Sequence, residues 1–172
     1  VTIDSSANDV VFDLVGSTVQ ANAELSKAFK DNSFQWYTGG DLPWVLSDKI
    51  VDLSLTLEAG QVVDNGSSLL TTYFTGSGSV SYTVTSDITE NEALLIYIDN
   101  ELVDLYYGAS ASRTQSTNGN SITVESGEHQ IIFAYISLES EKGSRLWLES
   151  FSFTGSGATS NTTSGGTSST KA

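Results

Sequence analysis

The sequence predicts an all-β protein, folded as a two-sheet antiparallel sandwich or jelly roll with one short helix near the N-terminus. Three observations favour this class. Apolar residues recur at every second position, two segments are apolar on both faces, and clusters of glycine, aspartate and asparagine separate the segments at short intervals. Short, regularly spaced strands divided by turns are typical of antiparallel sandwiches and jelly rolls.

The strands can be placed from the spacing of their apolar residues. Alternation of apolar and polar positions indicates a strand with one buried side, and a segment that is apolar on both faces indicates a strand at the centre of a sandwich. The expected strands are residues 10–15, a strand with Leu53, Leu55 and Leu57 on one side, another with Val80, Tyr82 and Val84 on one side, the apolar segments 94–98 and 131–136, and a last strand that contains Phe151 and Phe153.

Turns are expected where glycine, aspartate and asparagine gather, because these residues accept the backbone angles of tight turns. The expected turns lie at residues 64–66, 76–78, 99–100, 118–120 and 126–128. The short helix is predicted between Asn22 and Lys30, where Asn22 can cap the N-terminus and Leu25, Ala28 and Phe29 share a face.

The chain divides into three parts. Residues 1–9 are a polar lead-in, residues 10–154 form the jelly-roll β-sandwich domain, and residues 155–172 are a tail or linker rich in Ser, Thr and Gly. Of the 18 residues in the last part, 14 are Ser, Thr or Gly. Such a stretch buries too little apolar surface to offset the entropy cost of ordering it, so we expect a linker or stalk.

Composition excludes several classes of function. The chain has 21 Asp and Glu against 7 Lys and Arg, a formal net charge of −14, so its surface repels the phosphates of nucleic acids and anionic lipids. No segment approaches the about 18 apolar residues of a membrane span, so we expect no membrane insertion. With no cysteine and one histidine, the chain has no disulfides and little material for zinc sites or Ser/His catalysis.

Six segments between Phe34 and Phe153 follow one another in a recognisable order: WYTGGDLPW, AGQVVDNGSSLL, GSVSYTV, ALLIYIDNELV, VESGEHQIIFAYIS and RLWLESFSF. This ordered set resembles a family of bacterial extracellular jelly-roll modules related to MAM domains and to carbohydrate-binding modules. The sequence departs from that family at Glu149, where the family has aspartate, and at Phe133, where tryptophan is common. The resemblance implies a secreted or surface-displayed module that acts in binding, adhesion or spacing rather than catalysis.

Ligand-binding candidates come from exposed aromatic residues, because a planar ring can stack on the apolar face of a sugar. Trp36, Tyr37 and Trp44 bracket a Gly-Gly-Asp turn that contains Asp41. The alternative is that both tryptophans fill one end of the sandwich and that Asp41 only forms the turn. Tyr107, together with Arg113, is a second candidate ligand surface, and its alternative is a strand end with one tyrosine ring turned inward.

Calcium is the metal that suits an acidic, cysteine-free, extracellular β-sandwich, because carboxylate and carbonyl oxygens favour a hard cation. In jelly-roll relatives a structural ion often joins an acidic residue of the first strand to one of the last. This implies Asp13 and Glu149 as ligands here. The alternative is that each is an exposed or locally hydrogen-bonded acid, and no EF-hand spacing occurs.

No residue is predicted to be catalytic. The one histidine, His129, begins an expected strand, where a structural role is more common than a chemical one. Nothing in the sequence selects a carboxylate pair for glycoside hydrolysis among the 21 acidic residues.

Two functions remain after these exclusions. The first is a non-catalytic secreted or cell-surface module that binds a polysaccharide or another cell-surface ligand, with calcium as a structural ion. The second is a structural subunit that assembles with copies of itself into an extracellular filament or surface layer, in which a terminal segment adds as a strand to a neighbouring sheet.

Overall fold

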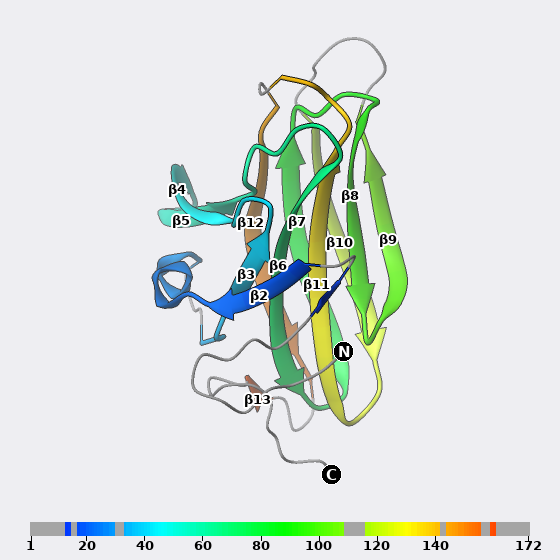
Figure 1. Cartoon of the computed structure of the whole chain (residues 1–172). Helices are drawn as coiled ribbons and strands as arrows, with labels where there is room; N and C mark the ends of the chain where they lie inside the picture. The colour runs from blue at the N-terminus through cyan, green and yellow to red at the C-terminus, as the bar shows by residue number, and fades with distance from the viewer. Residues whose placement is uncertain are drawn as a thin grey trace.

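The computed structural model describes residues 13–14, 17–29, 33–108, 116–141, 144–155 and 159–160. These residues form two antiparallel sheets that pack face to face (Figure 1). The predicted two-sheet antiparallel jelly-roll β-sandwich is confirmed. The elements are β1 (Asp13–Leu14), β2 (Ser17–Ala21), η1 (Ala23–Lys27), β3 (Tyr37–Gly40), β4 (Val45–Val51), β5 (Ser54–Glu58), β6 (Gly66–Thr75), β7 (Gly78–Ser86), β8 (Glu92–Ile98), β9 (Glu101–Tyr107), β10 (Ser116–Val124), β11 (Glu128–Ser137), β12 (Leu146–Thr154) and β13 (Thr159–Ser160).

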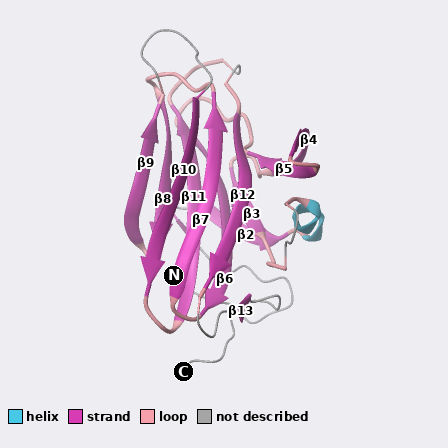
Figure 2. Cartoon of the chain, turned by 180° about the vertical axis from the view of Figure 1, so that it is seen from behind, coloured by secondary structure: helices cyan, strands magenta, loops and turns pink. Residues whose placement is uncertain are grey.

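The two sheets differ in size. The larger has eight strands in the order β1-β2-β3-β6-β11-β8-β9, with β13 paired to β6. The smaller has five strands in the order β10-β7-β12-β5-β4, and Figure 2 shows β7 between β10 and β12. The hairpin of β4 and β5 projects from one side of the sandwich beside η1 (Figures 1 and 2). Across the described ranges, no helix is long and apolar enough to span a membrane.

The core between the sheets is built on aromatic rings. The ring of Phe151 in β12 meets three other rings edge to face, at centroid distances of 5.0 Å to Phe34, 5.2 Å to Trp36 and 6.2 Å to Phe133. Tyr82 of β7 contacts Phe133 of β11 in the same geometry, at 5.6 Å. These contacts join the two sheets, because each pair takes one ring from the smaller sheet and one from the larger sheet or the segment before β3.

The central strands of the larger sheet are buried on both faces, as the apolar segments 94–98 and 131–136 predict. Alternate residues of β11 enter the core between the sheets, and the others join a second cluster on the opposite face. That second cluster contains Val19, Tyr37, Leu69, Tyr73, Ile132 and Ala134. In the smaller sheet, Val80, Tyr82 and Val84 all point into the core, as predicted.

The predicted turns at 64–66, 76–78, 99–100 and 126–128 are confirmed, and the one at 118–120 is wrong. Asp99 and Asn100 form the two-residue turn between β8 and β9, with φ angles of 53° and 70°. Residues 118–120 instead continue β10, where they pair with residues 82–84 of β7. The pairing with β7 supplies a hydrogen-bonded partner strand along this segment, and it overrides the weak strand preference of glycine and asparagine.

Leu53 does not share a face with Leu55 and Leu57, contrary to the alternation of the sequence. Val51 pairs with Ser54, so Asp52 and Leu53 are the two turn residues of the β4–β5 hairpin, with φ angles of 52° and 67°. The side chain of Leu53 is 93% exposed at the tip of this hairpin. The reversal of the chain at this point removes Leu53 from the strand that buries Leu57.

The predicted helix between Asn22 and Lys30 is only a 3-10 turn, η1. Asn22 caps it as expected, because its side chain accepts a hydrogen bond from the backbone N–H of Glu24. The turn stops at Ala28, which forms a bridge with Leu55 of β5, and the backbone N–H of the next residue donates to the Leu55 carbonyl. The backbone after η1 therefore forms its hydrogen bonds with β5 instead of continuing as a helix.

The ends of the predicted domain, at residues 10 and 154, stay a prediction. Residues 1–9 lie outside the described residues, and within the expected first strand of residues 10–15 the structure describes β1 alone. In the segment predicted as a tail, β13 pairs with Phe74 and Thr75 of β6.

Asp41 forms the turn after β3, which is the alternative role named for it above. Its backbone N–H donates to the Ser67 carbonyl, and its carboxylate accepts from the Ser67 N–H, both at 2.8 Å. These two hydrogen bonds tie the end of β3 to the start of β6.

Replacing Trp36 by alanine is expected to lower the free energy of unfolding by about 3–5 kcal/mol, because it leaves a cavity beside Phe151. Chemical denaturation measures this change. The control is Tyr107→Ala, whose side chain is 72% exposed and whose loss is expected to change stability by less than about 0.5 kcal/mol. Equal stability of the two variants would contradict the assignment of Trp36 to the core.

The substitution Asp41→Ala is expected to lower the free energy of unfolding by about 1–2 kcal/mol, since it leaves the Ser67 N–H without its carboxylate acceptor. Asp41→Asn keeps an acceptor oxygen at the same place and should retain most of the stability. A similar loss in both variants, measured by the same denaturation, would show that the hydrogen bond is not the cause.

Candidate functional site

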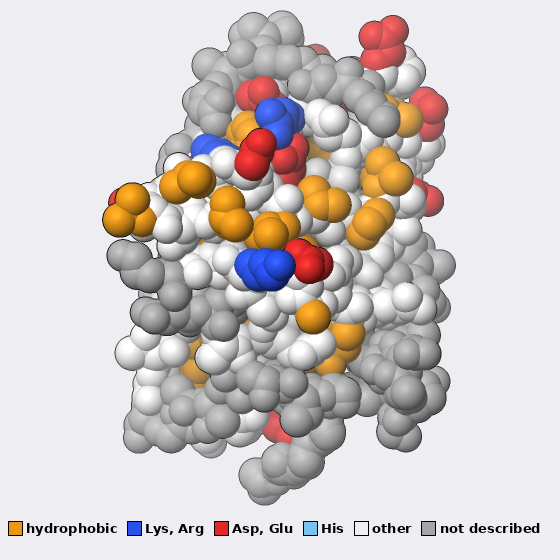
Figure 3. Space-filling model, turned by 90° about the vertical axis from the view of Figure 1, so that its left-hand side faces the viewer, with side chains coloured by type: hydrophobic (Ala, Val, Ile, Leu, Met, Phe, Trp, Pro, Cys, Tyr) orange, Lys and Arg blue, Asp and Glu red, His pale blue; other side chains and the backbone are white. Residues whose placement is uncertain are grey.

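A groove with a volume of about 500 Å³ opens on the smaller sheet between the β4–β5 hairpin and β12. We call it the β12 groove. Figure 3 shows this side of the molecule, where hydrophobic side chains gather in a band across the face. The groove is lined by Phe29, Val51, Asp52, Ser54, Thr83, Glu149, Ser150, Phe151 and Ser152.

The groove exists because β5 leaves β12 early. The two strands pair only at Trp147 with Glu58 and at Leu148 with Leu57. Beyond this point the register of β12 against β7 on its other side shifts between Leu148 and Ser150, which marks a β-bulge at Glu149. A bulge bends its strand, so the hairpin diverges from β12 and a gap opens between them.

The segment that follows η1 contributes to the lining of this gap. The bridge between Ala28 and Leu55 brings Phe29 beside β5, and the Phe29 ring packs against Trp36 at 6.1 Å. Phe29 also lines the groove, as does Phe151 from the core. Phe29, Phe151 and Val51 therefore form the apolar part of the groove, and the two aromatic rings among them are anchored in the core.

The remaining lining is polar. Asp52 and Glu149 supply carboxylates, and Ser54, Thr83, Ser150 and Ser152 supply hydroxyl groups. Glu149 forms an ion pair with Lys49 at 2.5 Å. The groove thus offers hydrogen-bond acceptors and donors around a small apolar surface, which is the combination that binds a ligand with both hydroxyl groups and apolar faces.

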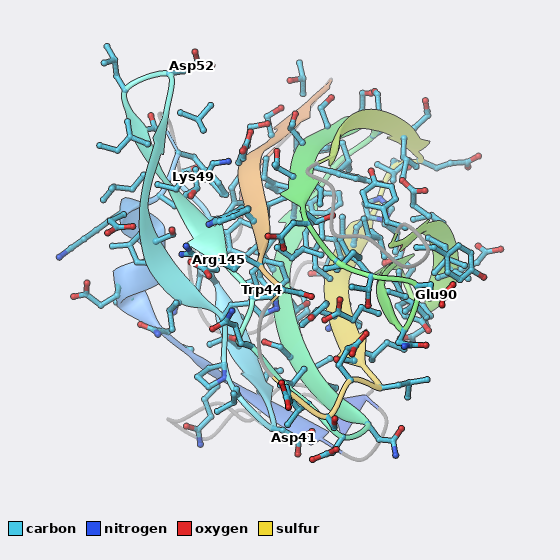
Figure 4. All side chains as sticks on the ribbon, turned by 90° about the horizontal axis from the view of Figure 1, so that it is seen from above. Asp41, Trp44, Lys49, Asp52, Glu90 and Arg145 are labelled. Carbon is cyan, nitrogen blue, oxygen red and sulfur yellow. The ribbon has the colours of Figure 1, made fainter. Side chains whose placement is uncertain are left out.

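A layer of charged side chains covers Trp147 next to the groove. The Nζ atom of Lys49 lies 4.5 Å from the centroid of the Trp147 ring, and the Cζ atom of Arg145 lies 4.9 Å from it. Arg145 donates two hydrogen bonds to the carboxylate of Glu58, at 2.7 and 2.8 Å. These bonds raise the pKa of the Arg145 guanidinium further above its ordinary value. Figure 4 shows Lys49 and Arg145 between the β4–β5 hairpin and β12, with Asp52 at the hairpin tip.

The tryptophan-bracketed turn is not an exposed aromatic surface. Trp36, Tyr37 and Trp44 are each 0% exposed, and the indole N–H of Trp44 donates to the Ser68 carbonyl at 3.1 Å. Their rings present no face to a ligand, which corrects the expectation of sugar stacking here. The alternative interpretation, in which the tryptophans fill the sandwich and fold the loop, describes what is observed.

The second predicted ligand surface lies away from the groove. Tyr107 is exposed at the end of β9, which is an edge strand of the larger sheet. Arg113 lies outside the described residues. The structure therefore brings neither of the two predicted aromatic surfaces to the β12 groove.

The predicted calcium ligands are not brought together as a described site. Glu149 is bound to Lys49, while Asp13 lies in β1 at the edge of the other sheet and its side chain is outside the description. Among the described residues, no group of three or more His, Cys, Asp or Glu side chains is placed to hold a metal ion. Of the two predicted ligands, the one whose side chain is described, Glu149, is paired with the ammonium group of Lys49, and a calcium ion at Asp13 and Glu149 stays a prediction.

His129 is bound within the fold. Its Nδ1 atom lies 2.7 Å from the carboxylate of Asp99, its Nε2 atom contacts the Glu125 carbonyl, and its ring packs on Phe74. The second oxygen of Asp99 accepts from the Gln130 N–H. The histidine thereby fastens the turn before β9 to the start of β11, which is a structural role.

Sequence reasoning missed Trp147 and Lys49. Arg145, Trp147 and Glu149 occupy alternate positions of one strand, a spacing that places them on one face and that was visible in the segment RLWLE. Lys49 carried no such signal, because it lies 100 residues before Glu149 in the sequence.

No family model and no curated protein matches the sequence. Membership of the MAM-related family therefore stays a prediction. Among solved structures, the secreted serine protease VesC from Vibrio cholerae is similar to this chain with a TM-score of 0.56 at 16% identity, over 79% of this chain and 28% of the protease. This likeness supports the fold, and the chain spans about a quarter of that protein.

Two carbohydrate-binding modules also match at lower similarity. The module CBM6cm-2 from Cellvibrio mixtus lichenase 5A, in complex with cellotriose, has a TM-score of 0.37 at 12% identity, over 73% of this chain and 91% of the module. The CBM36-1 domain of a multidomain xylanase from the hindgut metagenome of Trinervitermes trinervoides has a TM-score of 0.36 at 15% identity. The match covers 82% of this chain and 98% of that domain. At these TM-scores, the two modules carry no argument about the ligand of this chain.

Proposed function

We propose that this chain is a non-catalytic carbohydrate-binding module of a secreted or surface-displayed protein, and that the β12 groove is its ligand site. The observation that carries the proposal is the lining of the groove, in which aromatic rings lie among carboxylate and hydroxyl groups. Sugar rings present apolar C–H faces and a rim of hydroxyl groups, so both parts of the lining have a matching partner. A volume of about 500 Å³ is also in the range of small-molecule sites.

The surroundings of the groove favour a long ligand. Leu42, Val45, Ile50 and Leu53, on and before the β4–β5 hairpin, are between 39% and 93% exposed. Exposed hydrophobic side chains are also spread across this side of the molecule in Figure 3, beyond the groove itself. A polysaccharide that lies across the hairpin would cover these side chains, which a single sugar could not do.

The charge of the chain favours an uncharged ligand. The formal net charge is −14, and both cations beside the groove are paired, Lys49 with Glu149 and Arg145 with Glu58. An acidic polysaccharide would meet repulsion without a free cation at the described groove. We therefore expect neutral polysaccharides to bind and polyuronates to be excluded.

Binding rather than catalysis is proposed because, of the two carboxylates that line the described groove, Asp52 and Glu149, the second is engaged in an ion pair. Glu149 is held by Lys49, and the histidine of the chain is bound to Asp99 elsewhere in the fold. A structural calcium ion stays a prediction outside this proposal, since the described predicted ligand, Glu149, is paired with Lys49.

Self-assembly by strand addition remains a prediction without a supporting contact. The one described pairing of a terminal segment, β13 with β6, occurs within a single chain.

The proposal is tested by affinity electrophoresis of the full chain in gels that contain xylan, mixed-linkage β-glucan, galactomannan or polygalacturonate. We expect at least one neutral polysaccharide to retard the protein and polygalacturonate not to do so. Ser150→Tyr fills the groove from an exposed strand position and should lower the affinity by about tenfold or more, which corresponds to about 1.4 kcal/mol.

The matched control is Ser126→Tyr, which adds the same ring at an exposed turn outside the groove lining. It should leave the retardation unchanged. Unaltered migration of the wild type in every gel would overturn the proposed function, and equal retardation of both tyrosine variants would place the ligand elsewhere.

A further inference from the structure

Trp147 has an unusual position for a tryptophan in a sandwich. Its neighbours Leu146 and Leu148 belong to the core between the sheets, so the alternation of β12 turns Trp147 toward the outer face. The residue is nevertheless only 7% exposed, because the side chains of Lys49 and Arg145 lie over its ring. A planar aromatic surface on the outside of the sheet is thus covered by two charged side chains.

The two covering side chains are held differently. Arg145 makes two hydrogen bonds to Glu58, which is itself buried and accepts a further hydrogen bond from Ser47. Lys49 makes a single ion pair, and it lies in the part of β4 where the register shifts between Ser47 and Ile50. Because one ion pair holds Lys49 whereas two hydrogen bonds in a planar fork hold Arg145, Lys49 is the side chain that moves more readily.

The indole N–H of Trp147 is a second, independent sign of an incomplete site. The Nε1 atom is fully buried, and no group of the described residues accepts a hydrogen bond from it. Buried donors are nearly always paired in folded proteins, because an unpaired one loses its hydrogen bonds to water without replacement. Trp44, by contrast, donates its indole N–H to a backbone carbonyl.

We propose that Trp147 is a covered stacking surface that extends the β12 groove, and that a sugar ring opens it by displacing Lys49. This inference rests on the proposed function and adds a second subsite to it. With Arg145 still in place, displacement of Lys49 would uncover three groups together: the part of the Trp147 ring under Lys49, the indole N–H and the carboxylate of Glu149. A sugar offers a partner to each of them, its apolar face to the ring, a hydroxyl oxygen to the N–H and a hydroxyl hydrogen to the carboxylate.

The arrangement joins the new subsite to the groove already described. Glu149 lines the groove and lies two residues beyond Trp147 on β12, and Lys49 contacts both. One polysaccharide chain along β12 would therefore meet the groove and the Trp147 ring as neighbouring sites.

Tryptophan fluorescence distinguishes the open from the covered state. Trp36 and Trp44 are fully buried, so quenching of the emission by acrylamide reports on Trp147. Lys49→Ala removes the movable cover. We expect it to raise the acrylamide quenching constant at least about twofold. We also expect it to tighten binding of the neutral polysaccharide that retards the wild type, by about three- to tenfold.

Trp147→Phe keeps an aromatic ring without the N–H and should weaken the same binding several-fold, with folding checked by thermal melting.

Lys27→Ala is the matched control, because Lys27 is ion-paired with Glu24 on η1 and neither residue lines the β12 groove. It should change neither quenching nor binding. If the wild type binds but Lys49→Ala changes neither the quenching nor the binding, the proposal that Lys49 covers a second subsite is contradicted, while the β12 groove remains the proposed ligand site. Weaker binding by Lys49→Ala would contradict the second subsite as well, since Lys49 would then be a ligand contact. Absence of binding in the wild type and in Lys49→Ala overturns this inference together with the proposed function.

Discussion

The two sheets are joined through Phe151, which carries the edge-to-face contacts of β12 with the rest of the core. Its ring meets Phe34 and Trp36 from the segment before β3 and Phe133 from β11. Each contact adds the preferred geometry of an aromatic pair to the burial of a large apolar surface. The position of β12 relative to the larger sheet depends on these rings, and so does everything that β12 carries on its outer face.

The β12 groove follows from that position. Because Phe151 fixes β12 from inside, the bulge at Glu149 bends the strand away from β5 and leaves the neighbouring hairpin without a partner on that side. After η1, Ala28 then bridges to Leu55, and Phe29 contributes its ring to the lining of the gap. Core packing and a local defect of the sheet together make a concave surface on a strand face that would otherwise be flat.

Local patterns predicted most of the framework. The alternation of Val80, Tyr82 and Val84 and the turn at Asp99 and Asn100 were correct, because each depends on a few neighbouring residues. The predictions for Leu53 and for residues 118–120 were wrong, because pairing with another strand determines the structure of both segments. The β4–β5 hairpin reverses at Leu53, and pairing with β7 keeps residues 118–120 in a strand. The prediction of the ligand-binding residues was less accurate than that of the strands, since the sequence of an aromatic residue in a turn is the same whether its ring faces water or the core.

The sequence by itself determined the class of fold, the acidic surface and the absence of disulfides, since these depend on composition and on spacing along one segment. Tertiary structure alone decided which tryptophan lies near the surface. Trp36 and Trp44 are fully buried, whereas the charged side chains of Lys49 and Arg145 lie over the ring of Trp147 on the outer face of β12. Lys49 and its partner Glu149 are 100 residues apart, and only the packing of the β4–β5 hairpin beside β12 brings them together.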